Sequence, residues 1–259
     1  MTCRRPPPEI SKAKATLSSS SPQTAKIPRR FYRTAPRRCP YLADRVERDI
    51  FTDLTGPEPA QVYDALSQAG FRRSHHIVYR PLCPSCRACV PVRVAVREFA
   101  PSRSLRRILN ANADLAVREL AARATAEQYR LFACYQRSRH NGGGMSAMSF
   151  ADYQAMVEDS PVDTFITEFR SPLGELVATS LNDRLSDGLS AVYSCFDPAV
   201  TKRSLGTFTV LQLIRQAQAE DLSFVYLGYW IQASPKMAYK VRFRPLQALG
   251  GDGWQPLKV

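Results

Sequence analysis

The sequence YSCFDPAVTKRSLGTF, residues 193–208, decides the fold of the second half of this chain because it joins a predicted strand to a predicted helix. Residues Leu189–Phe196 form the strand, and Asp197 and Pro198 end it. The helix covers Ser204–Glu220, and its apolar residues recur on one stripe: Leu205, Phe208, Leu211, Ile214 and Ala217. The backbone amides and the dipole at the start of such a helix attract anions, so the sequence predicts an anion site there.

Strands and helices on either side of this segment complete a mixed sheet. Thr164–Phe169 and Glu175–Leu181 are predicted strands joined by a turn at Pro172–Gly174. Phe224–Leu227 is a short apolar strand, and Ser234–Tyr239 is a short helix. The order of three strands, a helix, a strand and a helix predicts an α/β or α+β fold with a mixed sheet.

Three strands and four helices are predicted upstream of residue 160. Two of the strands are short, at His76–Tyr79 and Leu115–Val117. The third is half-buried and lies at 90–97, where valines alternate with Pro91, Arg93, Ala95 and Arg97. Thr125 and Gln128 form a capping-box pair that begins a helix running to about Arg139. The other three helices are predicted at Glu58–Ala69, Arg103–Asn112 and Phe150–Glu158.

The net charge of +13 arises entirely in the first 107 of the 259 residues, because basic and acidic side chains balance in the rest of the chain. Residues 1–28 are rich in Ser, Pro and Lys with almost nothing to bury, which predicts a disordered basic tail. Residues 29–107 form a predicted N-terminal domain rich in Arg and Cys, and residues 108–259 form a second predicted domain without net charge. This asymmetry is typical of a polyanion-binding module attached to a neutral core, although a solvated basic surface explains the charge equally well.

Membrane and export signals are absent from the sequence. No apolar run approaches the roughly 20 residues of a membrane helix, and the N-terminus lacks the apolar core of a signal peptide. Seven cysteines, an odd number, in such a chain favour a cytoplasmic location with free or metal-bound thiols.

Four of the cysteines form a candidate metal site: Cys39, Cys83, Cys86 and Cys89. The last three repeat every third residue, and four thiolates suit a tetrahedral zinc ion or an iron–sulfur cluster. Two other interpretations stay open, namely small buried hydrophobic residues in a tight turn and a knuckle that faces nucleic acid.

Two further segments carry candidate ligand-binding residues. Lys202 and Arg203 add charge to the predicted anion site, and the pattern Arg203-x-x-Gly206-x-Phe208 resembles the phosphate loop of GNAT acyltransferases. Phe208 stands where that loop has a small residue, so we expect it to crowd the pyrophosphate of CoA. Residues 226–240 gather aromatic and cationic side chains suited to stacking on a base or binding phosphate or carboxylate. An aromatic core edge with solvated lysines is the alternative.

Five segments resemble the aminoacyl-tRNA–protein transferases of the N-end rule, and most closely their bacterial leucyltransferase branch: FYRTAPRRCPYL (31–42), GFRRSHHIVYRPLCPSCRACVPVRV (70–94), YSCFDP (193–198), SLGTF (204–208) and YLGYWIQASPKMAYKVRFRP (226–245). The resemblance implies a GNAT-like catalytic domain that requires no cofactor. It also implies transfer of leucine from leucyl-tRNA to the α-amino group of proteins that begin with Asp or Glu, which marks them for degradation. Leucine as the cargo rests on the resemblance alone.

Three groups of residues are candidates for this reaction. The candidates for catalysis, near the expected opening of the sheet, are Tyr193, Asp197 and Tyr229. The candidates for binding the donor and its phosphates are Lys202, Arg203, Ser204, Gly206, Trp230 and Tyr239. The candidates for recognising an acidic first residue are Arg80, Arg87, Lys236 and Lys240.

The reaction requires little chemical activation by these groups because the donor ester is already activated. We therefore expect positioning and stabilisation of the oxyanion to supply most of the rate. Two rival functions remain open: a cysteine-knuckle RNA-binding protein without catalysis, and a CoA-dependent GNAT acyltransferase.

Overall fold

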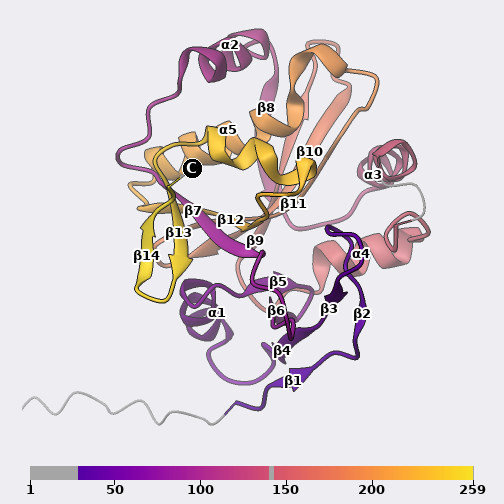
Figure 1. The fold of residues 1–259 in the computed structure, drawn as a ribbon. Coiled ribbons are helices and arrows are strands. Elements are labelled where there is room, and N and C mark those ends of the chain that lie inside the picture. The colour runs from indigo at the N-terminus through magenta and orange to yellow at the C-terminus, as the bar shows by residue number, and fades with distance from the viewer. Residues whose placement is uncertain (1–28, 140–142, 259) are drawn as a thin grey trace, which may run out of the picture. The chain divides into compact units, whose positions relative to one another are not determined.

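An eight-stranded mixed sheet runs through the part of the chain that the computed structural model describes, residues 29–139 and 143–258 (Figure 1). The strands follow the spatial order β14 (Gly253–Pro256), β13 (Leu246–Gly250), β7 (Val90–Ala95), β12 (Phe224–Trp230), β11 (Gly188–Phe196), β10 (Leu176–Leu185), β9 (Thr164–Arg170) and β8 (Ala116–Ala121). Only β11 and β12 pair in parallel among the neighbours in this described sheet. The predicted α/β fold with a mixed sheet is confirmed.

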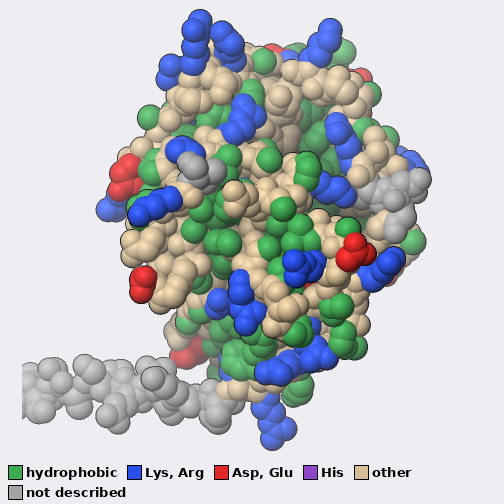
Figure 2. All heavy atoms as spheres, in the orientation of Figure 1, with side chains coloured by type: hydrophobic (Ala, Val, Ile, Leu, Met, Phe, Trp, Pro, Cys, Tyr) green, Lys and Arg blue, Asp and Glu red, His purple; other side chains and the backbone are tan. Residues whose placement is uncertain are grey.

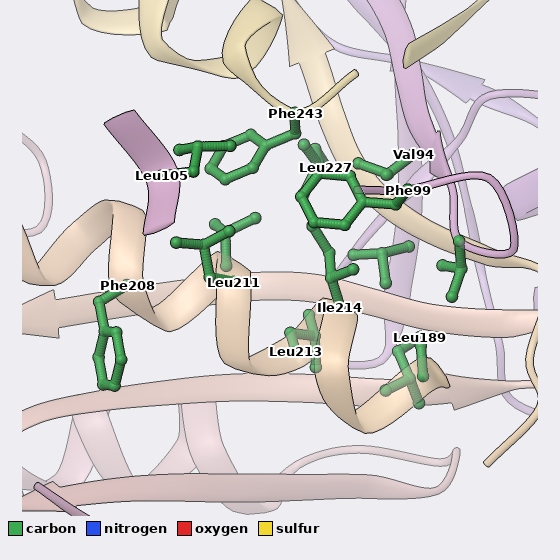
Figure 3. Close-up of a cluster of buried hydrophobic side chains, with 14 of the residues drawn as sticks. Val94, Phe99, Leu105, Leu189, Phe208, Leu211, Leu213, Ile214, Leu227 and Phe243 are labelled. Atoms are coloured by element: carbon green, nitrogen blue, oxygen red, sulfur yellow. The ribbon is translucent and has the colours of Figure 1, made fainter. Parts of the chain in front are cut away.

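Helix α5 (Leu205–Ala219) covers one face of the sheet and forms the largest core with it (Figure 3). The predicted stripe of α5 is buried in full, and helix α2 (Arg103–Ala111) packs against α5 through Leu105 and Leu109. Burying a large apolar side chain contributes about 1.5–3 kcal/mol, so this stripe fixes α5 on the sheet. The start of α5 is thereby held at the end of β11.

Helices α3 (Ala126–Arg139) and α4 (Phe150–Glu158) cover the opposite face of the sheet. Neighbouring residues of a strand point to opposite faces, and β9 shows this, since Phe165 lies in the α5 core whereas Ile166 packs with α3 and α4. The predicted capping box is present: the amide of Thr125 donates to Gln128 Oε1 at 3.0 Å, and the amide of Gln128 donates to Thr125 Oγ1 at 3.2 Å.

The N-terminal region builds two smaller sheets around helix α1 (Pro59–Gln68). The four-stranded sheet has the order β1 (Tyr32–Arg33), β4 (Asp49–Asp53), β6 (Ile77–Pro81) and β5 (Arg72–Ser74). The two-stranded sheet consists of β2 (Arg37–Arg38) and β3 (Val46–Glu47). Two 3-10 helices, η1 (Thr201–Arg203) and η2 (Pro235–Arg242), lie in the C-terminal half.

The N-terminal region and the large sheet are joined within one compact unit, Phe31–Val259. Strand β7 precedes residue 107 but lies between β12 and β13 in the large sheet. The predicted division at residue 107 therefore stays a proposal about sequence modules that share one sheet. The predicted disordered tail, residues 1–28, lies outside the described residues. Within the described chain, no helix is long and apolar enough to cross a membrane.

A buried ion pair ties β5 to β10. Arg73 Nη2 lies 2.6 Å from Asp183 Oδ1 and Arg73 Nε lies 2.7 Å from Asp183 Oδ2, with both side chains fully buried. Tyr63 of α1 donates to the same carboxylate at 2.8 Å. Removing one partner of such a pair costs about 3–5 kcal/mol because the other charge stays buried. The strand that carries Arg73 is thus anchored rigidly against the large sheet.

Candidate active site at the opening of the sheet

The parallel strands β11 and β12 diverge and leave an opening in the large sheet. Their register runs through Gly188↔Phe224, Leu189↔Val225 and Ser190↔Tyr226 and then ends. Both strands continue beyond this point, to Phe196 and Trp230. Backbone carbonyls on both sides of the opening therefore need partners other than a neighbouring strand.

Two basic side chains supply those partners. Arg72 Nη2 donates to the carbonyls of Ala191 and Val192 on β11, at 3.0 and 2.9 Å. Lys240 Nζ donates to the carbonyls of Leu227 and Tyr229 on β12, at 2.8 and 2.5 Å. Burial, with a further contribution from the nearby Arg72 guanidinium, holds the pKa of Lys240 well below its usual value.

Gly228 allows Arg72 to lie across β12. Its φ is +70°, and a Cβ added there would lie 2.1 Å from Nη1 of Arg72 and 2.4 Å from its Cζ. No side chain fits at that distance, so the glycine and the arginine require one another. Arg72 comes from the N-terminal region, which therefore supplies a residue to the opening of the large sheet.

Two adjoining cavities lie at this opening. The larger cavity has a volume of 490 Å³ and the smaller cavity a volume of 300 Å³. Four residues line both of them: Tyr135, Ser194, Lys236 and Tyr239. The two cavities therefore share part of their walls, and together they are called the cleft.

The larger cavity combines aromatic rings, cations and the start of a helix. Residues 204–207, at the start of α5, line it. The rings of Tyr135 and Phe196 lie 4.8 Å apart between centroids, and the guanidinium of Arg139 lies 5.9 Å from the Phe196 centroid. A Cβ added to Gly206 would lie 2.9 Å from Phe196 Cε1, so the ring approaches the helix closely only because this residue is glycine. Such a surface suits the phosphate and base of a nucleotide.

The smaller cavity combines Arg72 and Lys240 with neutral hydroxyl and amide groups. These are Ser180, Asn182, Tyr193, Ser194 and Thr209. Among the described residues, neither cavity has Asp, Glu or His in its lining. The smaller cavity therefore suits a ligand that carries negative charge.

Tyr193 is held as a protonated hydrogen-bond donor. Its hydroxyl oxygen accepts from Gln136 Nε2 at 2.7 Å, which leaves the hydroxyl proton for another acceptor. Burial is the main cause that raises the pKa of Tyr193, with a smaller contribution from Cys195. The phenol therefore keeps its proton at neutral pH.

The structure brings six of the predicted site residues to the cleft. Ser204 and Gly206 line the larger cavity, Tyr193 and Lys240 line the smaller one, and Lys236 and Tyr239 line both. They come from β11, α5 and η2, whose ends meet at the opening of the sheet.

Four other candidates from the same loops line neither cavity. The Tyr229 hydroxyl donates to the carbonyls of Gly70 and Tyr79, both at 3.0 Å, and Trp230 lies in the core. Asp197 Oδ1 accepts from the amide of Ala199 at 2.9 Å. Lys202 is an exposed residue of η1.

The three remaining arginine candidates are engaged elsewhere. Arg203 Nη2 forms an ion pair with Asp114 Oδ1 at 2.5 Å. Arg80 Nη1 donates to the carbonyl of Ala69 at 2.9 Å. Arg87 Nη1 donates to two carbonyls of its own loop, those of Cys83 at 2.6 Å and Cys86 at 3.1 Å.

The expectation that Phe208 crowds the phosphate loop is wrong. The side chain is 1% exposed and its ring packs edge-on against Phe169, with centroids 5.7 Å apart. Figure 3 shows it pointing from α5 toward the strands. The same stripe that predicts the helix places Phe208 in the core, away from the larger cavity.

The predicted zinc or iron–sulfur site is not supported. Burial, and then the thiols of Cys83, Cys39 and Cys86, raise the pKa of Cys89 to about 12, so the four cysteines lie within electrostatic reach of one another. A shared metal requires sulfurs converging at about 2.3 Å from one point. In the described part of the chain, no three His, Cys, Asp or Glu residues are arranged to hold a metal ion.

Sequence patterns missed several residues of the cleft, namely Arg72, Tyr135, Arg139 and Asn182. The sequence does contain an indication for Arg72, because Arg72 and Arg73 are neighbours on a strand and their side chains must point to opposite faces. One of them enters the buried pair with Asp183 and the other enters the opening. Tyr135 and Arg139 lie one helical turn apart near the end of α3. No local sequence pattern indicates that this end of α3 lies beside β11.

Comparison with known proteins assigns the family. Residues 37–107 match the family model "Arginine-tRNA-protein transferase, N terminus", and residues 127–250 match "Arginine-tRNA-protein transferase, C terminus". A protein of Paramagnetospirillum magneticum named aspartate/glutamate leucyltransferase is 56% identical over 230 residues, which are 89% of this chain and 94% of the relative. This chain belongs to the aspartate/glutamate leucyltransferase family.

Further relatives carry the same name. The Gluconacetobacter diazotrophicus protein is 53% identical over 89% of this chain and 88% of its own length. The Rhodospirillum rubrum protein is 53% identical over 88% of this chain and 93% of its own length. The residues matched by the two family models, 37–107 and 127–250, include all the cavity-lining residues named above as well as the four clustered cysteines.

Solved structures show more distant similarity. The structure of L-PGS from Bacillus licheniformis has a TM-score of 0.46 and 12% identity, over 70% of this chain and 52% of that chain. A tandem GNAT protein from the clavulanic acid biosynthesis pathway has a TM-score of 0.40 and 12% identity, over 82% of this chain and 59% of that chain.

Proposed function

We propose that this protein transfers leucine from leucyl-tRNA to the α-amino group of proteins whose first residue is Asp or Glu, which marks them for degradation by the N-end rule. The observation that carries the proposal is a cleft of two adjoining cavities at the opening of the sheet, in a chain 56% identical to a protein named for this activity. Because aminoacyl-tRNA is a cytoplasmic molecule, we expect the protein to work in the cytoplasm.

The larger cavity is the proposed site of the donor's 3′ end. Amides at the start of α5 face a phosphate there, and the helix dipole adds to the attraction. Tyr135, Phe196 and Tyr239 offer rings on which a terminal base stacks. Arg139 and Lys236 add positive charge at the same cavity. The leucyl ester then lies where the larger cavity meets the smaller one.

The smaller cavity is the proposed site of the acceptor's first residue. The guanidinium of Arg72 is fixed across the opening by two carbonyls, and no carboxylate lies among the described lining residues. An acceptor Asp or Glu would bring the missing negative charge and form charge-assisted hydrogen bonds. Lys236 supports the same preference from the shared wall, whereas Arg80 and Arg87 lie away from both cavities.

The reaction exchanges an ester for an amide. The acceptor's neutral α-amine attacks the leucyl carbonyl carbon, the new C–N bond forms, and the C–O bond to the ribose breaks. Tyr193 donates its hydroxyl proton in a hydrogen bond to the oxygen that gains negative charge. Lys240, with its lowered pKa and two N–H groups directed to Leu227 and Tyr229, keeps a lone pair for the proton that leaves the amine. That proton finally reaches the ribose oxygen.

Incubation with charged leucyl-tRNA and synthetic peptides tests the proposal. We expect peptides that begin with Asp or Glu to gain the mass of one leucine residue, and peptides that begin with Asn, Gln, Arg or Ala to stay unmodified. Acetyl-CoA in place of leucyl-tRNA serves as the control for a CoA-dependent acyltransferase. RNA binding without any transfer, or transfer from acetyl-CoA, would contradict the proposal.

A further inference from the structure

Helix α2 presents a basic face that the proposed reaction does not yet use. Arg103, Arg106 and Arg107 follow the spacing of one helical face, and all three are exposed. The opposite face is apolar and packs into the core through Leu105 and Leu109. No Asp or Glu occurs between residues 98 and 114, and none of the three arginines has an ion-pair partner in the described part of the chain.

The C-terminal end of α2 contacts the segment that forms the rim of the larger cavity. Asn112, the C-cap of α2, donates from Nδ2 to the carbonyl of Arg203 at 2.8 Å. Arg203 is also held by its ion pair with Asp114. It ends η1, and the next residue, Ser204, lines the cavity. Figure 2 shows Lys and Arg side chains gathered at the end of the molecule where Figure 1 places α2.

We propose that the basic face of α2 binds the sugar–phosphate backbone of the donor RNA, outside the cavity that takes its 3′ end. This inference rests on the proposed function. The leucyl group remains attached to its RNA until transfer, so the RNA must leave the larger cavity across a rim, and the C-terminal end of α2 contacts that rim. Arg106 Nη1 donates to the carbonyl of Pro101 at 2.7 Å, but within the described chain no carboxylate holds any of the three guanidinium groups. Guanidinium groups of this kind bind phosphates through two parallel hydrogen bonds. Contacts of this kind position the RNA without reading its sequence.

The test compares two donors and two triple variants. One variant carries R103Q, R106Q and R107Q. The matched control, which loses the same charge from exposed positions on β8, the following turn and α3, carries R118Q, R123Q and R130Q. The donors are full-length leucyl-tRNA and the leucyl ester of the trinucleotide CCA, which lacks the sugar–phosphate backbone beyond the 3′ end.

We expect the α2 variant to raise the KM for leucyl-tRNA by about tenfold or more and to lower the slope of log KM against log salt by about 2 to 3. The trinucleotide donor should react equally well with wild type and variant, and the control triple should change neither donor's KM. An unchanged KM for leucyl-tRNA, an equal rise in the control, or an equal loss with the trinucleotide would overturn the inference. Failure of the wild-type protein to transfer leucine at all would instead overturn the proposed function.

Discussion

Substitution of Gly228 by alanine tests whether Arg72 lies across the opening of the sheet. A Cβ at this position costs about 1–2 kcal/mol for the left-handed backbone alone. It would also stand 2.1 Å from Arg72 Nη1, so the guanidinium must leave the carbonyls of Ala191 and Val192. Hydrogen bonds from a charged group are worth about 1.5–3 kcal/mol. We therefore expect Gly228→Ala to reduce the free energy of unfolding by about 3–5 kcal/mol.

Gly174 provides the matched control. Its φ is +84°, yet nothing lies within 4 Å of a Cβ added there. Gly174→Ala should therefore lower the free energy of unfolding only by the cost of the left-handed backbone, about 1–2 kcal/mol. Urea unfolding measures both variants, and the excess of about 1.5–3 kcal/mol corresponds to a melting temperature lower by about 3–12 °C. In an Arg72→Ala background the excess should vanish. Equal costs for the two glycine variants would refute the placement of Arg72.

Three further substitutions probe the cleft and its support. Tyr193→Phe should lower kcat by about 10²–10³, because the proposed donor to the oxyanion is lost, and an unchanged kcat would exclude that role. Asp183→Asn should lower the unfolding free energy by about 3–5 kcal/mol by leaving Arg73 buried without its partner, and a loss under 1 kcal/mol would contradict this. Lys240 has a folded-state pKa below its unfolded value, so wild-type stability should rise, relative to Lys240→Met, as pH rises from the lowered pKa to about 10.4. If the free energy of unfolding changed with pH in the same way for the two proteins, the lowered pKa of Lys240 would be ruled out.

Regular elements were predictable where a periodic apolar pattern fixes them. The segment at 193–208 gave the strand that ends at Phe196 and the helix that begins at Leu205, within one residue of the structure. The strand predicted at His76–Tyr79 corresponds to β6, but the shortest strands of the N-terminal region were not predicted, because elements of two or three residues, such as β1 and β2, are too short for a pattern. Their stability comes from pairing with distant segments.

The cleft was only partly predictable because distant segments build it. Ser204, Gly206 and Tyr239 lie in segments whose composition already indicated a ligand. The role of Arg72 depends on the divergence of β11 and β12, and strand divergence leaves no trace in local sequence. Phe208 illustrates the opposite kind of error. Its motif suggested a place beside the bound phosphate, but the face of α5 on which it lies places its side chain in the core.

The ratio of kcat/KM for a peptide that begins with Asp to that for the same peptide beginning with Asn tests the central claim most directly. Both peptides are assayed with the same enzyme preparation, so the ratio of the two kcat/KM values does not depend on the fraction of a variant that is active. If Arg72 recognises the acidic side chain, the wild-type ratio should exceed about 10², and Arg72→Met should bring it close to one. A ratio that stays high in Arg72→Met would contradict the assignment of the smaller cavity to the acidic acceptor.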